Sequence, residues 1–211
     1  KLKESGEFDC VALRHAQYCR DLLHCVELDW QGQAAENKPP MLNDLAGNVR
    51  TAIDWAYSSA GDALLAVTLA AAAAPLWMHL SMANECSQQI GRALATLDSL
   101  PEHEPRLDMR LLTAQGLALL STMSAGPEAR KVFEQALEIA ERLEDGDYRL
   151  RSLWGVCSAC FNDGDFLRAR DAARRFHELA TASGDANALV SGDLLLGGVL
   201  LTMADYAGAR A

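Results

Sequence analysis

The feature that most constrains this chain is an internal repeat in its C-terminal half. Asp165 aligns with Asp205 and Phe166 with Tyr206, while Ala169 aligns with Ala209 and, one period earlier, with Ala129. A period of about 40 residues is typical of stacked supersecondary units. An aromatic residue followed closely by alanine suits the corner of a helical hairpin, because the ring packs between the helices and the alanine lets them approach. The repeat therefore predicts a stack of hairpins.

The composition predicts that these hairpins are helical. Alanine and leucine supply 69 of the 211 residues, whereas the β-branched valine, isoleucine and threonine supply 18. This balance favours helix over strand. We expect an all-α protein, a right-handed α-α superhelix built from antiparallel helical hairpins.

The periodicity of apolar residues places helices over about 2–28, after a break at Gly6, over 43–58 and over 84–100. The polar stretch 31–40 predicts a loop, and the stretch 102–105 predicts a linker. We therefore expect an N-terminal helical segment over 1–100 and repeats over 101–211. The chain starts at Lys1 and stops just after a helix is expected to begin, so we interpret it as a fragment with a truncated last repeat.

One uncharged stretch, residues 63–84, is long enough to cross a membrane. It is rich in alanine, which contributes little transfer free energy, and acidic residues flank it without a basic anchor. We expect instead a pair of buried helices, with Pro75 opening or kinking the second one.

Charge and cysteine usage narrow the function. The formal charge of -10 argues against binding to nucleic acid or to an anionic membrane. Six cysteines lie scattered in sequence that is predicted to be helical, unlike the dense frameworks of small secreted domains. They predict reduced thiols and a cytoplasmic protein.

The sequence contains no pattern typical of catalysis or of cofactor binding. It has no Gly-x-x-x-x-Gly-Lys-Ser/Thr phosphate loop and no Gly-x-Ser-x-Gly elbow. Cys157 and Cys160 have no second cysteine pair and no histidine at ligand spacing, so we interpret them as buried structural thiols. The five histidines form no local acid-base group. We expect no enzymatic activity, no metal and no cofactor in this chain.

Two sets of residues carry a resemblance to known families. The C-terminal half resembles the tetratricopeptide (TPR) pattern at the following residues: Gly116, Ala129, Phe133, Ala136, Trp154, Gly155, Gly164, Asp165, Phe166 and Ala169. The strings at 4–8, 14–18 and 48–56 (Asn-Val-Arg-Thr-Ala-Ile-Asp-Trp-Ala) resemble the region that follows the nucleotide-binding module in winged-helix or LuxR-type transcriptional regulators of the STAND ATPase class. Gly47 stands where that family usually has an acidic residue.

This resemblance implies a sensor or effector-binding region of a bacterial transcriptional regulator, with the ATPase outside the chain. Its partners would be a protein or small-molecule effector and the rest of the regulator. Two alternatives stay open: a stand-alone TPR scaffold for protein-protein interaction, and a small helical hydrolase or lipid-binding domain.

In TPR register, the first helix of each hairpin lines a concave groove. The resemblance therefore implies a binding groove formed by Arg110, Thr113, Arg151, Trp154, Ser158, Phe161 and Asn162. An arginine beside aromatic rings suits a peptide or a small acidic ligand. The alternative is that Trp154 and Phe161 pack against the adjacent repeat.

We predict that the chain alone neither hydrolyses ATP nor binds duplex DNA, because it lacks a phosphate loop and is acidic. Filter binding at low salt and a phosphate-release assay check this. Micromolar affinity for DNA would contradict it.

Overall fold

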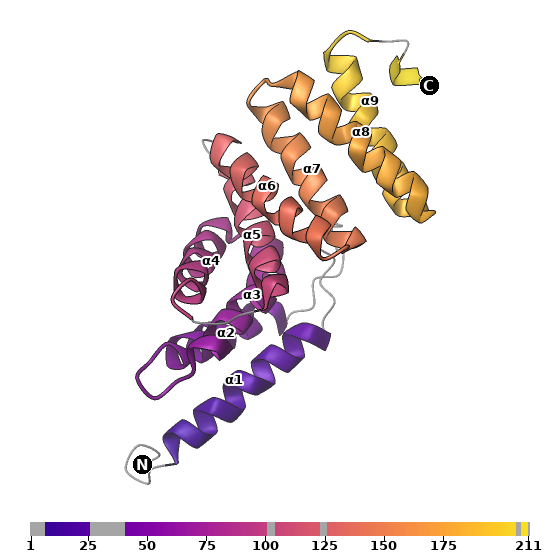
Figure 1. Cartoon of the computed structure of the whole chain (residues 1–211). Helices are drawn as coiled ribbons and strands as arrows, with labels where there is room; N and C mark the ends of the chain where they lie inside the picture. The colour runs from indigo at the N-terminus through magenta and orange to yellow at the C-terminus, as the bar shows by residue number, and fades with distance from the viewer. Residues whose placement is uncertain (1–6, 26–40, 101–103, 123–125, 206–207, 211) are drawn as a thin grey trace. The chain divides into compact units, whose positions relative to one another are not determined.

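The computed structural model describes residues 7–25, 41–100, 104–122, 126–205 and 208–210, and every regular element in these ranges is helical. The expected all-α fold is confirmed. The chain divides into two compact units, residues 1–107 and 108–211, so the boundary lies slightly beyond the one expected from the sequence. Figure 1 shows the helices coloured along the chain, and each unit is described by itself below.

Unit 1 contains α1 (Phe8–Cys25), α2 (Met41–Ala56), α3 (Ala63–His79) and α4 (Ala83–Leu97). Helix α3 contacts each of the other three. It is apolar on all sides, and eleven of its residues between Leu65 and Trp77 are buried. A helix that is hydrophobic all round belongs in a core.

The expectation that Pro75 opens a second helix is wrong. Helix α3 runs through Pro75 to His79, and the second helix begins only at Ala83. A proline inside a helix lowers stability by about 3 kcal/mol. The burial of apolar residues before and after Pro75 along α3 outweighs that cost. Within the described ranges, none of the helices combines the length and the apolar character that crossing a bilayer requires.

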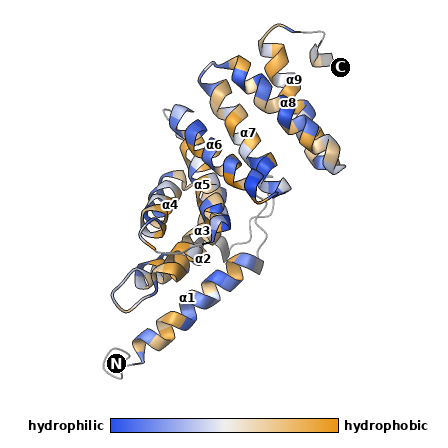
Figure 2. Ribbon diagram, viewed as in Figure 1, coloured by the Kyte–Doolittle hydropathy of each residue, from blue (hydrophilic) through white to orange (hydrophobic). Residues whose placement is uncertain are grey.

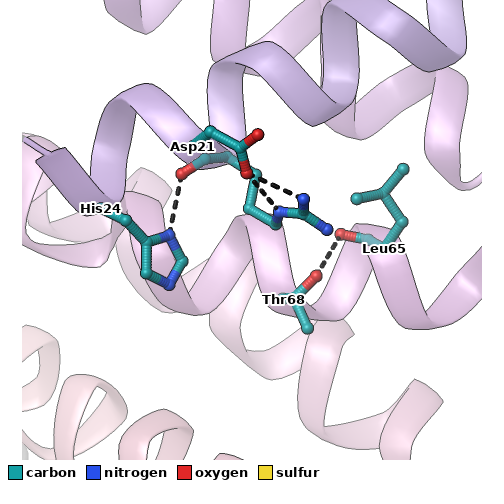
Figure 3. Close-up of polar contacts among 5 residues, drawn as sticks. Asp21, His24, Leu65 and Thr68 are labelled. Carbon is teal, nitrogen blue, oxygen red and sulfur yellow. Dashed lines mark hydrogen bonds and ion pairs between the residues drawn. The ribbon is translucent and has the colours of Figure 1, made fainter.

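Several polar side chains of α1 and α3 make local contacts. Arg20 pairs with Asp21 at 2.8 Å, and Nδ1 of His24 donates to the Arg20 carbonyl oxygen at 2.8 Å. Figure 3 draws these contacts at the labelled Asp21 and His24. On α3 the Thr68 hydroxyl donates to the Leu65 carbonyl oxygen at 3.0 Å. The buried side chains of α1 include Ala16, Cys19 and Leu23.

Two residues of the 48–56 string on α2 form hydrogen bonds to neighbouring helices of unit 1. Nε and Nη2 of Arg50 donate to the two carboxylate oxygens of Glu85 on α4 at 2.5 and 2.8 Å. This bidentate contact raises the pKa of Arg50. Nε1 of Trp55 donates to Asp9 on α1 at 3.2 Å. These two residues of the string therefore join α2 to its neighbours.

Unit 2 contains most of α5 (Pro105–Leu120), then α6 (Gly126–Arg142), α7 (Gly146–Asn162), α8 (Phe166–Ser183), α9 (Ala186–Thr202) and the 3-10 turn η1 (Gly208–Arg210). From α6 to α9 each helix packs against the next. Hydrophobic and hydrophilic residues alternate around α6 and α8, as expected of amphipathic helices with one buried stripe (Figure 2). Ala129 and Ala169 are fully buried, as predicted, whereas Ala209 is half-buried in η1.

Four junctions in unit 2 recur at equal intervals with one geometry. In each, a residue with positive φ precedes an aspartate: Glu144 (54°), Gly164 (77°), Gly184 (69°) and Ala204 (60°). The aspartates at 145, 165, 185 and 205 each accept a hydrogen bond from a backbone N–H two or three residues ahead, at 2.8 to 3.2 Å. One aspartate therefore caps the start of every element from α7 to η1.

Three of these aspartates also complete the preceding helix. The backbone N–H groups of Asp145, Asp165 and Asp205 donate to the carbonyl oxygens of Ala140, Cys160 and Leu200, each at 2.9 Å. This is the backbone hydrogen bond of the Schellman C-terminal motif, which requires the left-handed residue before it. At these junctions a left-handed residue and the aspartate after it end one helix and begin the next.

Phe133 of α6 fills the space between its two neighbouring helices. A Cβ on Gly116 of α5 would lie 2.7 Å from the Phe133 ring, and a Cβ on Gly155 of α7 would lie 2.4 Å from it. Real Cβ atoms do not approach so closely, so both positions need glycine for the ring to fit. The ring is fully buried.

Replacing Ala204 by glycine should raise the free energy of unfolding by about 1 kcal/mol, since a left-handed residue with a Cβ is strained by roughly that amount. The reverse change, Gly164→Ala, should lower it by a similar amount. Urea unfolding of the chain followed by circular dichroism measures both. Equal stability of both variants and the parent would contradict the strain.

Replacing Gly155 by alanine should lower the free energy of unfolding by about 1–3 kcal/mol, because the new Cβ overlaps the Phe133 ring. Gly146→Ala is the matched control on the same helix, with open space around its Cβ, and should be neutral or stabilising by about 0.5–1 kcal/mol. Adding Phe133→Leu should recover part of the loss in Gly155→Ala but not in the control.

Candidate functional site

Helix α7 presents two large apolar side chains to solvent. Trp154 and Phe161 are each 38% exposed, although both neighbouring helices of α7 are in place. They lie two turns apart along one face, with the half-buried Ser158 between them and the exposed Asn162 beside Phe161. Phe161 also makes an edge-to-face contact with Phe166, at 5.4 Å between ring centroids. These four predicted site residues therefore share an accessible face.

A basic group lies at the amino-terminal end of this face. Arg151 pairs with Asp147 at 2.9 Å, and its guanidinium carbon lies 5.2 Å from the centroid of the Tyr148 ring. The positive charge of Arg110 on α5 also acts on Tyr148. Burial raises the pKa of Tyr148, and the positive charges of Arg110 and Arg151 oppose that rise. Two arginines and a tyrosine thus meet here, and the tyrosine was not among the residues expected from the sequence.

The structure corrects one predicted site residue. Thr113 is fully buried, and its hydroxyl donates to the Met109 carbonyl oxygen at 2.7 Å. A threonine bonded to its own helix backbone offers nothing to a ligand. Thr113 lies one helical turn before Gly116, which meets the Phe133 ring, so it shares the side of α5 that packs inward. Ser152, at the same place relative to Gly155 on α7, is fully buried as well.

Helix α9 adds two residues that the sequence reasoning missed. Leu194 is 73% exposed and Leu201 is 55% exposed. They stand one repeat period after Trp154 and Phe161, and α9 contacts α7. The repeat period itself could have identified them. We call Trp154, Phe161, Leu194 and Leu201, with Ser158 and Gly198 between them, the α7–α9 face.

Val190 is also exposed on α9, but it is not part of this face. Its counterpart one period earlier, Leu150, packs against the buried cluster that includes Leu137 and Leu153. Leu194 and Leu201 differ because their counterparts on α7 stay exposed when the next hairpin is present. Part of the exposure at these two positions therefore belongs to the repeat, since their counterparts on α7 are 38% exposed.

Cys157 and Cys160 face the other side of α7. Both are fully buried in the cluster around Phe133. Burial raises the pKa of Cys157 to about 12 and also raises the pKa of Cys160. Protonated, enclosed thiols suit packing rather than reactivity. Among the residues that the structure describes, no group of three or more His, Cys, Asp or Glu side chains could hold a metal ion.

The comparisons with known proteins support the fold alone. No protein-family model matches the sequence, and no curated protein matches it. Among solved structures, the crystal structure of BtubC (BKLC) from P. vanneervenii is similar, with a TM-score of 0.67 and 15% sequence identity. The match covers 96% of this chain and 85% of that chain. The chain thus shares its fold with that protein at low sequence identity.

Proposed function

We propose that the α7–α9 face binds an effector, and that the chain is the TPR-like sensor region of a bacterial transcriptional regulator with a STAND-type ATPase. The observation that carries the proposal is the exposure of Trp154, Phe161, Leu194 and Leu201 at equivalent positions of successive hairpins. Packing among the residues that the structure describes leaves all four of these large apolar side chains exposed. Exposed apolar patches of this kind are typical of binding surfaces.

The charged and apolar residues of this face indicate which class of effector it binds. Arg151 lies one turn before Trp154 on α7, and Arg110 acts on Tyr148 of the same helix, so an acidic and apolar ligand, either a protein segment or a small molecule, complements this face. The proposed chain has no catalytic role and no cofactor, and it acts in the cytoplasm. The resemblance of residues 48–56 to the regulator family supplies the link to a parent ATPase.

Binding would act by shifting a conformational equilibrium. An effector changes the state of the parent protein only if it binds one state more tightly than the other. The α7–α9 face spans two hairpins, so a ligand on it responds to their relative orientation. An assembly of the ATPase in which the hairpins are held differently would therefore bind the effector with a different affinity.

The test separates a binding role from a packing role for Trp154. Trp154→Ala should lower the free energy of unfolding by less than about 2 kcal/mol, against about 3–5 kcal/mol for the fully buried Phe133→Ala. In the full-length protein, Trp154→Ala and Arg151→Ala should abolish the transcriptional response to the effector in a reporter assay. Leu167→Ala, which removes an exposed apolar side chain elsewhere in unit 2, is the matched control and should respond normally.

Large destabilisation by Trp154→Ala together with a normal response by Arg151→Ala would overturn the proposal. A reporter that responds normally in all three variants, with stability preserved, would overturn it as well. A stand-alone scaffold would show the same loss of binding, but its full-length protein would contain no ATPase module.

A further inference from the structure

Two arginines and a tyrosine lie close together where α5 and α7 begin. Gly116 of α5 and Gly155 of α7 meet one phenylalanine ring, which fixes the level of the two helices. Arg110 precedes Gly116 by six residues and Arg151 precedes Gly155 by four, which is roughly 9 and 6 Å along the helices. The charges of both arginines act on Tyr148, so the three side chains form one cluster.

Arg110 lacks the partner that a half-buried arginine usually has. The chain holds 29 acidic residues against 19 basic ones, yet none of the residues that the structure describes pairs a carboxylate with Arg110. Charged side chains that leave water are normally paired. Burial raises the pKa of the neighbouring Tyr148, so its phenol stays protonated near neutral pH and can donate a hydrogen bond. The cluster is rich in donors and short of negative charge.

Arg151 already holds a carboxylate of its own helix. Its Nη2 lies 2.9 Å from Oδ2 of Asp147, and the Asp147 side chain is 63% exposed. An ion pair with one partner mostly in water is weak, so an incoming anion can replace it. With Asp147 counted, the two arginines leave one unbalanced positive charge in the cluster.

We propose that Arg110, Tyr148 and Arg151 bind the carboxylate of a small apolar acid, and that Asp147 competes with this ligand for Arg151. The inference rests on the proposed function and names the class of its effector. A planar carboxylate matches the guanidinium fork, and its single charge balances the cluster, whereas a phosphate dianion exceeds it. Trp154 follows Arg151 by three residues on α7, so the apolar part of the acid can contact its exposed ring.

Phenylacetate is the probe for this site, with uncharged phenylacetamide and dianionic phenyl phosphate as comparators. An NMR titration of the chain that follows the Trp154 indole N–H resonance gives the Kd. Phenylacetate should bind more tightly than either comparator. Arg110→Met and Arg151→Met should each weaken it by about tenfold or more, since each removes a charged hydrogen-bond donor.

The competing role of Asp147 has its own test. Asp147→Asn should tighten phenylacetate binding by about two- to fivefold, because no exposed ion pair has to break first. Asp171→Asn is the matched control: Asp171 pairs with Arg170 at 3.1 Å, and these two side chains are 64% and 29% exposed, against 63% and 27% for Asp147 and Arg151. The control changes the net charge equally and should leave the Kd unchanged.

Binding that survives Arg110→Met and Arg151→Met, or no binding to the parent and to Asp147→Asn, would overturn the site. Equal tightening by Asp147→Asn and Asp171→Asn would reflect net charge alone and overturn the competition. If the site fails while Trp154→Ala still abolishes the reporter response, the proposed function stands with another class of effector. If phenylacetate follows the variants but the reporter responds normally in Trp154→Ala and Arg151→Ala, the site stands and the proposed function falls.

Discussion

The rest of unit 2 depends on one recurring feature of its helix junctions, a left-handed residue followed by an aspartate. At each junction a left-handed residue precedes an aspartate that caps the next element, and at three of the four a Schellman hydrogen bond also ends the helix before it. Because the left-handed residue and the aspartate recur every 20 residues, successive helices have nearly the same length and equivalent rotations about their axes. This is why residues one period apart, such as Trp154 and Leu194, take equivalent places. The functional face is a consequence of the regularity of the turns.

Different residues fill the space between the helices in successive hairpins. The ring of Phe133 requires glycine at 116 and 155, whereas the positions one period after Phe133 and Gly155 hold Ala173 and Leu195. Both of these pack in the same apolar cluster as Phe133. In one hairpin the large side chain comes from the first of these positions, and in the next hairpin it comes from the second. The filled volume is conserved, but a different helix provides it. Sequence repetition is therefore weak in the core even where the backbone repeats closely.

The candidate site shows how much the TPR register predicts. The register places Trp154 and Phe161 on an accessible face of α7, and their exposure agrees with that placement. The expectation failed at Thr113, because this residue lies on the side of α5 that packs toward the Phe133 ring. It also left out Leu194 and Leu201, whose leucine side chains look like core residues when read singly. Composition cannot separate a buried leucine from an exposed one.

The sequence alone determined that the chain is helical, where the hairpins of the C-terminal half turn, and that they recur with a constant period. Local propensity, aspartate caps and left-handed residues act within a few positions, so these features can be read from neighbouring residues. The tertiary structure decided which side of each helix is buried, that α3 passes through Pro75, and that Thr113 is enclosed. Those outcomes depend on residues far apart in the chain, above all on a phenylalanine ring between two glycines, and no local pattern fixes such contacts.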